Sequence, residues 1–296
     1  MTTEKLPEDL PEQVSRALRE DIGPGDVTAE LIGPDVAARA QMLCRDAAMI
    51  CGAAWVDETF RQLEPRVRVQ WRVSDGATVA ADTVLCEIDG PARAILTGER
   101  TALNFMQLLS GTATATARYV QAVAGTGCRI LDTRKTIPGL RSAQKYAVRC
   151  GGGQNHRMGL YDRVLIKENH IAAAGSIAAA VSAARALAPG LVVEVETEDL
   201  EEFAAALAAR CDVIMLDDFS LADMRLAVAL NRAAPQPASL EASGGVDLER
   251  IAAIAATGVD CISIGSLTKH VQAVDLSLRL ALDRRSHPSR AGEVAQ

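Results

Sequence analysis

The 296-residue sequence is poor in aromatic side chains, which make up only 3% of it. Proteins that hold single-stranded nucleic acid stack the bases on such rings, so this class is disfavoured. The formal net charge of -7 predicts a surface that as a whole repels DNA and anionic membranes. The longest weakly apolar stretch, 171–184, is mostly alanine and is too short for a membrane span. We therefore expect no nucleic-acid partner and no membrane association.

Cysteine pairs with metal-site spacing are also lacking. The seven cysteines are odd in number and form no CxxC motif. We therefore expect reduced, mostly buried thiols in a cytoplasmic protein, and no structural zinc. The first ten residues carry acidic residues and a proline where a secretion signal has a basic end and an apolar stretch.

The first part of the sequence reads as a mixed α/β domain. Helix patterns at 10–20 and 98–109 enclose alternating segments at 67–73 and 84–88 that are typical of strands. We expect this domain to cover residues 1–111 and to be joined by a C-terminal helix over 275–296.

From about residue 128 onward, short apolar runs alternate with Ala/Leu-rich helices. These runs lie at 129–131, 164–166, 191–195, 213–216, 240–242 and 261–264. Fully apolar strands that alternate with helices indicate a parallel sheet covered by helices. The pattern allows either an open doubly wound sheet or a closed barrel.

Polar residues at the strand ends favour the barrel. Almost every apolar run is followed by charged residues or glycine, as at Asp132, Lys167 and Asp217. In a barrel all these ends meet at one mouth, whereas an open sheet uses only those near its switch point. Repeats of about 25 residues fit only six or seven times, so we expect an irregular barrel over 112–274.

Residues 134–167 hold eight Lys and Arg side chains against a single acid, Asp162. Arg134, Lys135, Arg157 and Lys167 flank strand ends or a glycine-rich turn, where Arg can clamp a carboxylate with two hydrogen bonds. We therefore expect a substrate with several negative charges. His156, beside Arg157, is a further candidate. Another subset recurs every four residues, which is typical of a solvated helix face: Arg141, Lys145 and Arg149.

Two glycine turns and two carboxylates complete the candidate site. The turns follow the last two predicted strands, and backbone N–H groups there can bind phosphate. The residues concerned are Ser243, Gly244, Gly245, Gly265 and Ser266. Glu196 and Asp217 end neighbouring strands, where they can orient sugar hydroxyls, hold Mg²⁺ through water, stabilise developing positive charge or form salt bridges.

These motifs resemble the quinolinate phosphoribosyltransferase family over nearly the whole chain. The matching segments are 99–104, 132–136, 138–141, 151–157, 166–170, 194–196, 216–217, 241–245 and 264–268. The resemblance implies an N-terminal α/β sandwich domain and an irregular seven-stranded α/β barrel. It also implies a homodimer in which the N-terminal domain of one subunit caps the barrel of the other.

The family's reaction transfers phosphoribose from phosphoribosyl pyrophosphate to quinolinate, and it forms nicotinate mononucleotide, pyrophosphate and CO₂ for NAD synthesis. The resemblance implies Mg²⁺ and no organic cofactor. By motif, the quinolinate carboxylates would be bound by Arg134, His156, Arg157 and Lys167, and by Arg100 from the partner subunit. The remaining roles fall on other residues: Thr133 would bind substrate, Lys135 would meet pyrophosphate, Glu196 and Asp217 would hold ribose and Mg²⁺, and the glycine turns would hold the 5′-phosphate. Lys135, Glu196 and Asp217 are the catalytic candidates.

Two residues depart from the family pattern. Asp218 stands where the family often has Asn, and Lys269 stands where a His commonly follows Leu-Thr. Both are expected beside the substrate contacts, so they concern details of metal and phosphate binding.

Two rival functions are considered. A related transferase that acts on nicotinate would leave part of the cation cluster unpaired, because nicotinate has one carboxylate. A non-catalytic barrel that only binds anions would lack some of Arg100, Lys135, Glu196 and Asp217, and all four are present.

Overall fold

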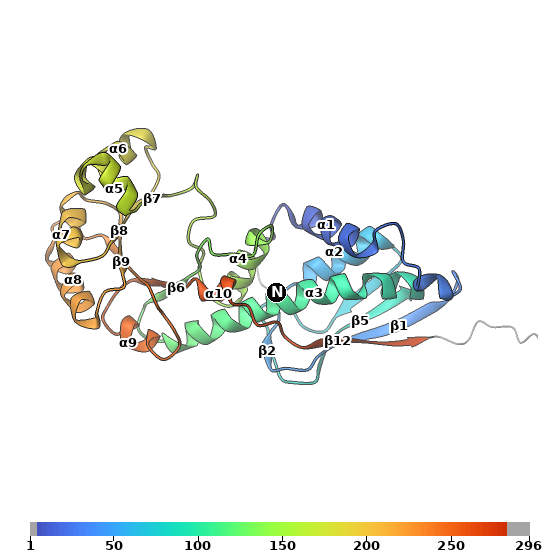
Figure 1. Cartoon of the computed structure of the whole chain (residues 1–296). Helices are drawn as coiled ribbons and strands as arrows, with labels where there is room; N and C mark the ends of the chain where they lie inside the picture. Colours follow the sequence, from blue (N-terminus) through green and yellow to red (C-terminus); the bar gives the residue numbers. More distant parts are fainter. Residues whose placement is uncertain (1–4, 283–296) are drawn as a thin grey trace, which may run out of the picture. The chain divides into compact units, whose positions relative to one another are not determined.

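The computed structural model describes residues 5–282, which divide into two units (Figure 1). The first unit takes in the chain up to Gly111 and the chain from Gln272 onward, and the second comprises Thr112–Val271. The long helix α3 (Ala92–Ala122) begins in the first unit and ends in the second.

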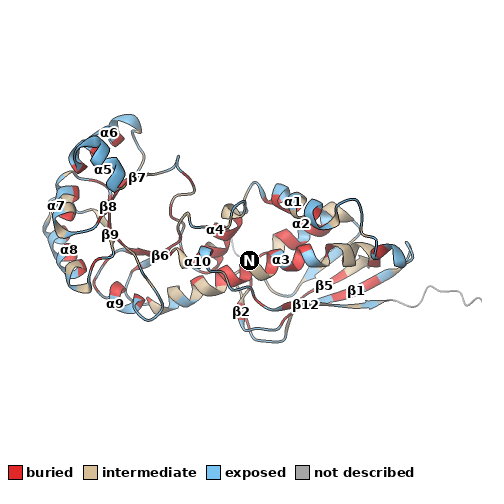
Figure 2. Cartoon of the chain, viewed as in Figure 1, coloured by how far each residue is buried: buried red, intermediate tan, exposed pale blue. Residues whose placement is uncertain are grey.

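The first unit is a four-stranded antiparallel sheet with helices on one face. The strand order is β12-β1-β5-β3. Its elements are α1 (Leu10–Ile22), a 3₁₀ turn (Ala29–Leu31), β1 (Ala37–Cys44), β2 (Ala48–Met49), α2 (Ala53–Leu63), β3 (Arg68–Trp71), β4 (Thr78–Val79), β5 (Thr83–Pro91) and β12 (Leu276–Leu282). Alternate residues of β1 are buried, because every second side chain points to the covered face. Met42, Phe60, Ile88 and Met106 lie in this core. Figure 2 shows buried residues along β1, β5 and α3.

The prediction of a C-terminal helix over 275–296 is wrong for residues 276–282. Residues Leu276–Leu282 form β12, which pairs antiparallel with β1. Leucine alternates there with other residues, and Leu276, Leu278 and Leu280 pack on the core of the first unit. A period of two is the strand period, so the alternation outweighs helix propensity. Residues 283–296 lie outside the described part.

The second unit is a curved parallel sheet of six strands, covered by helices. The strand order is β6-β11-β10-β9-β8-β7. Its strands are β6 (Arg129–Leu131), β7 (Val164–Ile166), β8 (Val193–Thr197), β9 (Val213–Asp217), β10 (Ser239–Ser243) and β11 (Cys261–Ser263). Its helices are α4 (Arg141–Cys150), α5 (Glu168–Ala174), α6 (Ile177–Leu187), α7 (Leu200–Ala208), α8 (Leu221–Ala233), α9 (Ile251–Ala255) and α10 (Ser266–Lys269).

The sheet does not close into seven regular strands over residues 5–282. Beyond β6 there is only a single parallel bridge, between Leu131 and Gln154. From Gln154 the chain runs on to β7, the opposite edge of the sheet, so this segment connects the two edges. The α/β barrel class expected from the sequence is confirmed, with six strands and one bridge in place of seven strands.

The sequence positions the helices through their caps. The Oγ of Ser176 accepts the N–H of Ala179 at 3.1 Å, and the Oγ of Ser220 accepts that of Asp223 at 3.1 Å. Both bonds satisfy donors that the first turn of a helix leaves free. The core beneath α6, α7 and α8 contains Phe203 and the apolar side chains of β8 and β9.

All seven cysteines are buried free thiols, as expected. Burial raises the pKa of Cys86 to about 12 and that of Cys128 to about 11. Among the described helices, no single one is long and apolar enough to cross a membrane; α5 and α6 pass that test only as a pair, bent by 92°.

Candidate active site

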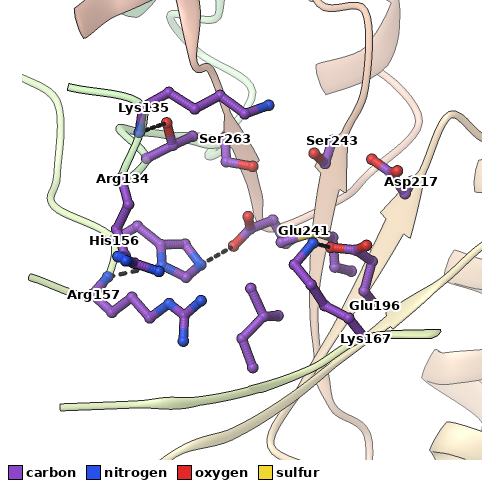
Figure 3. Close-up of a pocket in the computed structure, with 13 residues that line it drawn as sticks. Arg134, Lys135, His156, Arg157, Lys167, Glu196, Asp217, Glu241, Ser243 and Ser263 are labelled. Atoms are coloured by element: carbon purple, nitrogen blue, oxygen red, sulfur yellow. Dashed lines mark hydrogen bonds and ion pairs between the residues drawn. The ribbon is translucent and has the colours of Figure 1, made fainter. Parts of the chain in front are cut away.

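Two adjoining cavities open at the carboxyl ends of the barrel strands. The first has a volume of about 280 Å³ and the second about 380 Å³. Five residues line both: Thr133, Lys135, Asp217, Ser243 and Ser263. The first is otherwise lined by Arg134, His156, Arg157, Leu165, Lys167, Glu196, Met215 and Glu241 (Figure 3). The structure thus brings the expected residues of the second unit to one mouth.

The cations of the first cavity come from three places in the chain. Arg134 and Lys135 follow β6, Arg157 follows the glycine-rich turn after α4, and Lys167 directly follows β7. Within residues 5–282, the Nε of Arg134 is buried and has no hydrogen-bond partner. Burial, together with the positive charge of Arg134, lowers the pKa of Arg157. The unpartnered Nε of Arg134 and the repulsion between Arg134 and Arg157 give this cavity the electrostatics that suit an anion.

A fully buried ion pair sits behind these cations. Lys145 on α4 donates from Nζ to Asp132, and both side chains are 0% exposed. The same Nζ donates to the carbonyl of His156 at 3.0 Å, and Asp132 accepts the backbone N–H of His156 at 2.9 Å and the Nδ2 of Asn155 at 2.6 Å. The pair therefore ties the end of β6 to the turn that carries Arg157.

The expectation that Lys145 belongs to a solvated helix face is wrong. Its spacing from Arg141 and Arg149 is helical, but this face of α4 points into the unit rather than outward, and only the two Arg side chains are partly exposed. Burial raises the pKa of Asp132 and lowers that of Lys145, so desolvation disfavours the charged forms of both groups. Their mutual attraction and their hydrogen bonds favour the charged forms.

His156 is fixed in one orientation at the floor of the first cavity. Its Nδ1 accepts the backbone N–H of Arg157 at 2.8 Å, so a neutral ring carries its proton on Nε2. Nε2 lies 3.0 Å from an oxygen of Glu194 and 3.5 Å from one of Glu241. Arg163 also reaches Glu194, at 3.2 Å. His156 lines the predicted anion site, with both ring nitrogens directed at protein groups.

The two buried glutamates differ in their electrostatics. Burial acts to raise the pKa of Glu194, but hydrogen bonding to His156 and the charge of Arg163 outweigh it, and the pKa is lowered. Burial and the negative charge of Glu194 raise the pKa of Glu241 to about 7. Glu194 is thus the ionised member of this pair, and Glu241 holds a proton near neutral pH.

The second cavity is built from the two glycine turns. It is further lined by Asp218, Gly244, Gly245, Val246, Ile264, Gly265, Ser266 and Lys269. Gly244 has φ of 90°, and a Cβ there would lie 2.2 Å from Oδ1 of Asp218. A Cβ on Gly265 would lie 2.8 Å from Cδ of Lys135. Gly244 therefore requires glycine, whereas Gly265 has φ of -70° and a Cβ there would meet only the flexible side chain of Lys135. Asp218 and Lys269 line this cavity directly.

Carboxylates lie where the two cavities meet. Glu196 on β8 forms an ion pair with Lys167, and Asp217 ends β9. The backbone N–H of Asp218 donates to the carbonyl of Ser243 at 3.1 Å, which holds the β9 turn against the first glycine turn. Hard oxygen ligands of this kind suit Mg²⁺ and its water shell.

Sequence reasoning missed the buried polar residues behind the cations. Glu194, Glu241 and Lys145 were not among the predicted site residues, although Glu194 and Glu241 interrupt otherwise apolar strands, which is a usable signal. Arg100 lies in the other unit, on α3, where it is exposed.

The fold and cavities define a class: an α/β-barrel protein with a cationic pocket beside a glycine-lined pocket, preceded by an α/β domain. Family models for the C-terminal and N-terminal domains of quinolinate phosphoribosyl transferase match residues 112–279 and 26–110. The chain belongs to this family.

Individual relatives agree over most of their length. The chain is 43% identical to a probable nicotinate-nucleotide pyrophosphorylase (carboxylating) of Bacillus subtilis, covering 90% of this chain and 92% of that protein. It is 43% identical to the Mycobacterium leprae nicotinate-nucleotide pyrophosphorylase (carboxylating), covering 90% and 95%. The Francisella tularensis nicotinate-nucleotide pyrophosphorylase structure matches with a TM-score of 0.90 and 48% identity, covering 94% of this chain and 98% of that one.

Proposed function

We propose that this protein transfers phosphoribose from phosphoribosyl pyrophosphate to quinolinate, and releases nicotinate mononucleotide, pyrophosphate and CO₂ for NAD synthesis. The observation that carries the proposal is the pair of adjoining cavities, one cationic and one glycine-lined, which share Thr133, Lys135 and Asp217. A dianionic acceptor in the first and a phosphorylated sugar in the second would meet at these shared residues.

The cation cavity binds and orients the acceptor. Arg134, Arg157 and Lys167 line it and neutralise the two carboxylates, so the ring nitrogen is directed toward the sugar. Both ring nitrogens of His156 already face protein groups, and it supports the site by holding the backbone N–H of Arg157.

The donor side stabilises charge as the bond to pyrophosphate breaks. Positive charge develops on the ribose, and Glu196 and Asp217 lie at the border of the cavities to balance it. Lys135 lines both cavities and meets the departing pyrophosphate. Thr133 accepts the backbone N–H of Lys135 at 3.0 Å, which orients this turn. Ser243 and Ser266 line the 5′-phosphate cavity with the three glycines.

Glu196 and Asp217 line the first cavity and would hold Mg²⁺ there together with water and the bound substrate. When bound, it neutralises the leaving pyrophosphate, and no organic cofactor is required. We expect removal of divalent cations with EDTA to abolish product formation and added Mg²⁺ to restore it. Full turnover in EDTA would contradict this part of the proposal.

We further propose a homodimer in which Arg100 of one subunit completes the site of the other, in accord with the family resemblance. Mixed dimers of Arg100→Ala and Lys167→Ala chains would then contain one intact site. We expect activity to return on mixing the two inactive variants. Absence of recovery, with subunit exchange confirmed, would argue against a shared site. The free, buried cysteines support a reducing, cytoplasmic setting.

The reaction is tested by one incubation with carboxyl-labelled quinolinate, phosphoribosyl pyrophosphate and Mg²⁺. We expect labelled CO₂ and pyrophosphate in equal amounts, and no product from nicotinate, which would leave cations unpaired. Turnover of nicotinate but not quinolinate would replace our assignment with the related transferase. Binding of quinolinate without CO₂ release would favour a non-catalytic anion-binding barrel.

A further inference from the structure

The floor of the cation cavity contains an acid. Glu241 lies in the middle of β10, its residue is 0% exposed to bulk solvent, and it lines the cavity among Arg134, Arg157 and Lys167 (Figure 3). Within the described part of the chain, its Oε1 is buried and has no hydrogen-bond partner. An ionised carboxylate here would repel a bound dianion at close range, which opposes the purpose of the surrounding cations.

The neighbours of Glu241 keep one proton in the cluster. Glu194 is ionised, since Arg163 approaches it at 3.2 Å and the Nε2 of His156 lies 3.0 Å away. Glu241 faces the same Nε2 at 3.5 Å. Two buried carboxylates this close to the same imidazole do not both ionise readily, because the negative charge of Glu194 raises the pKa of Glu241. The remaining groups that influence Glu241 are Ser263, Cys261 and Arg163.

The same three residues also have the composition of a metal site, because His156, Glu194 and Glu241 present ligand atoms within 4.8 Å of one another. The hydrogen bond from the backbone N–H of Arg157 to Nδ1 argues against a metal. It leaves the proton of the neutral ring on Nε2, the atom that would have to donate its lone pair to the metal. The cluster is therefore built to hold a proton.

The proposed reaction needs one proton at this place. When CO₂ leaves the alkylated pyridine, the bond between the ring carbon and the carboxyl carbon breaks, and its electron pair stays on the ring carbon. That carbon must then take up one proton to form the product. Lys and Arg side chains nearby are needed as cations to hold the carboxylates, and the Nε2 of His156 lies 3.0 Å from an oxygen of Glu194 and 3.5 Å from one of Glu241.

We propose that Glu241 is a further catalytic residue, which stays a neutral carboxylic acid when quinolinate binds and donates its proton to the ring carbon as CO₂ departs. Its O–H bond breaks, a C–H bond forms, and the carboxylate that remains regains a proton from water after product leaves. The raised pKa of Glu241, about 7, supports this role. The inference rests on the proposed decarboxylating transfer.

The test is a single-turnover experiment with excess enzyme, carboxyl-labelled quinolinate, phosphoribosyl pyrophosphate and Mg²⁺, in which pyrophosphate and CO₂ are timed separately. Glu241→Gln keeps the size and an N–H donor but has no transferable proton. We expect it to form pyrophosphate within a few-fold of the wild-type rate and to release CO₂ about 10²-fold more slowly, which is the scale of general-acid catalysis. The carboxylated mononucleotide should accumulate.

Glu194→Gln is the matched control, because it alters the same buried cluster and keeps the acid at Glu241. Because loss of the Glu194 charge lowers the pKa of Glu241, we expect its ratio of CO₂ to pyrophosphate to stay near that of the wild type only at acidic pH, and its CO₂ release to slow at a lower pH than in the wild type. In the wild type, CO₂ release should slow as pH rises through about 7, where Glu241 loses its proton, and this dependence should vanish in Glu241→Gln.

The outcomes separate the inference from the function beneath it. If the wild type releases neither product, the proposed function fails. If the wild type is active and Glu241→Gln releases both products at wild-type rates, the proton role is wrong. If folded Glu241→Gln binds quinolinate poorly and loses both products equally, Glu241 is a positioning residue and the proposal is overturned. Thermal unfolding checks that each variant is folded, and Glu241→Asp, which retains the acid on a shorter chain, should restore part of the CO₂ release.

Discussion

The buried pair of Lys145 and Asp132 allows a quantitative prediction. In Lys145→Met, a side chain of similar length replaces the ammonium group, and Asp132 is left buried at 0% exposure without its countercharge. Asp132 keeps the hydrogen bonds from Asn155 and His156, which reduce the loss of stability. Removing one partner of a buried ion pair costs about 3–5 kcal/mol, so we expect the free energy of unfolding of Lys145→Met to fall by an amount in this range.

Lys145→Met should also weaken the binding of quinolinate. Asp132 directly precedes Thr133, and Lys145 donates to the carbonyl of His156, so loosening the pair displaces both sides of the cation cavity. We therefore expect Lys145→Met to raise the KM for quinolinate in addition to destabilising the protein. Urea unfolding followed by circular dichroism, together with quinolinate titration, measures the two effects.

Two variants serve as comparisons. The double variant Asp132→Asn/Lys145→Met removes both charges, and should recover part of the stability because no unpaired charge stays buried. Arg225→Met removes an exposed cation on α8, and should change stability by less than about 0.5 kcal/mol. The reasoning is refuted if Lys145→Met unfolds at the same urea concentration as Arg225→Met, or if the double variant is less stable than the single one by several kcal/mol.

Three further predictions concern the site and the barrel. Arg134→Ala should weaken quinolinate binding by about 2–5 kcal/mol, as for other buried charge pairs, and unchanged affinity by calorimetry would show that the clamp lies elsewhere. Gly244→Ala places a Cβ 2.2 Å from Asp218 and should raise the KM for phosphoribosyl pyrophosphate about tenfold with little change for quinolinate. A Cβ on Gly245 would lie 3.5 Å from its nearest neighbouring atom, so Gly245→Ala should raise this KM less. Equal effects of the two substitutions would contradict the steric argument. Ser220→Ala removes the cap of α8 and should cost about 1 kcal/mol in thermal unfolding with activity retained; no shift in Tm would count against the cap.

The sequence predicted the parts of the fold that depend on local periodicity. The apolar runs at 129–131 and 164–166 coincide with β6 and β7, and the Ala/Leu-rich helices expected between the runs include α6 and α8. Polar residues after each strand also pointed to one mouth, and the structure gathers Arg134, Lys167 and Asp217 around adjoining cavities.

Features that depend on packing were harder to predict. Helical spacing shows that Lys145 shares a face with Arg141 and Arg149, but it does not show which way α4 turns that face. Asp132, thirteen residues earlier, supplies the partner that makes burial of an ammonium group tolerable. The strand β12 was missed although Leu276, Leu278 and Leu280 alternate, because the pairing strand β1 lies more than two hundred residues away in sequence.

The unclosed edge of the barrel has a consequence for its mechanical strength. Arg134 stands beside one margin of the sheet, at the end of β6, and Lys167 stands at the other, at the end of β7. In the described barrel, backbone hydrogen bonds join all neighbouring strands of the sheet. Between the two margins, β6 and β7, there is instead a connecting segment, with a positively charged side chain near each margin. A dianion bound between those two side chains would attract both of them, and the ligand would then hold the two margins of the sheet together.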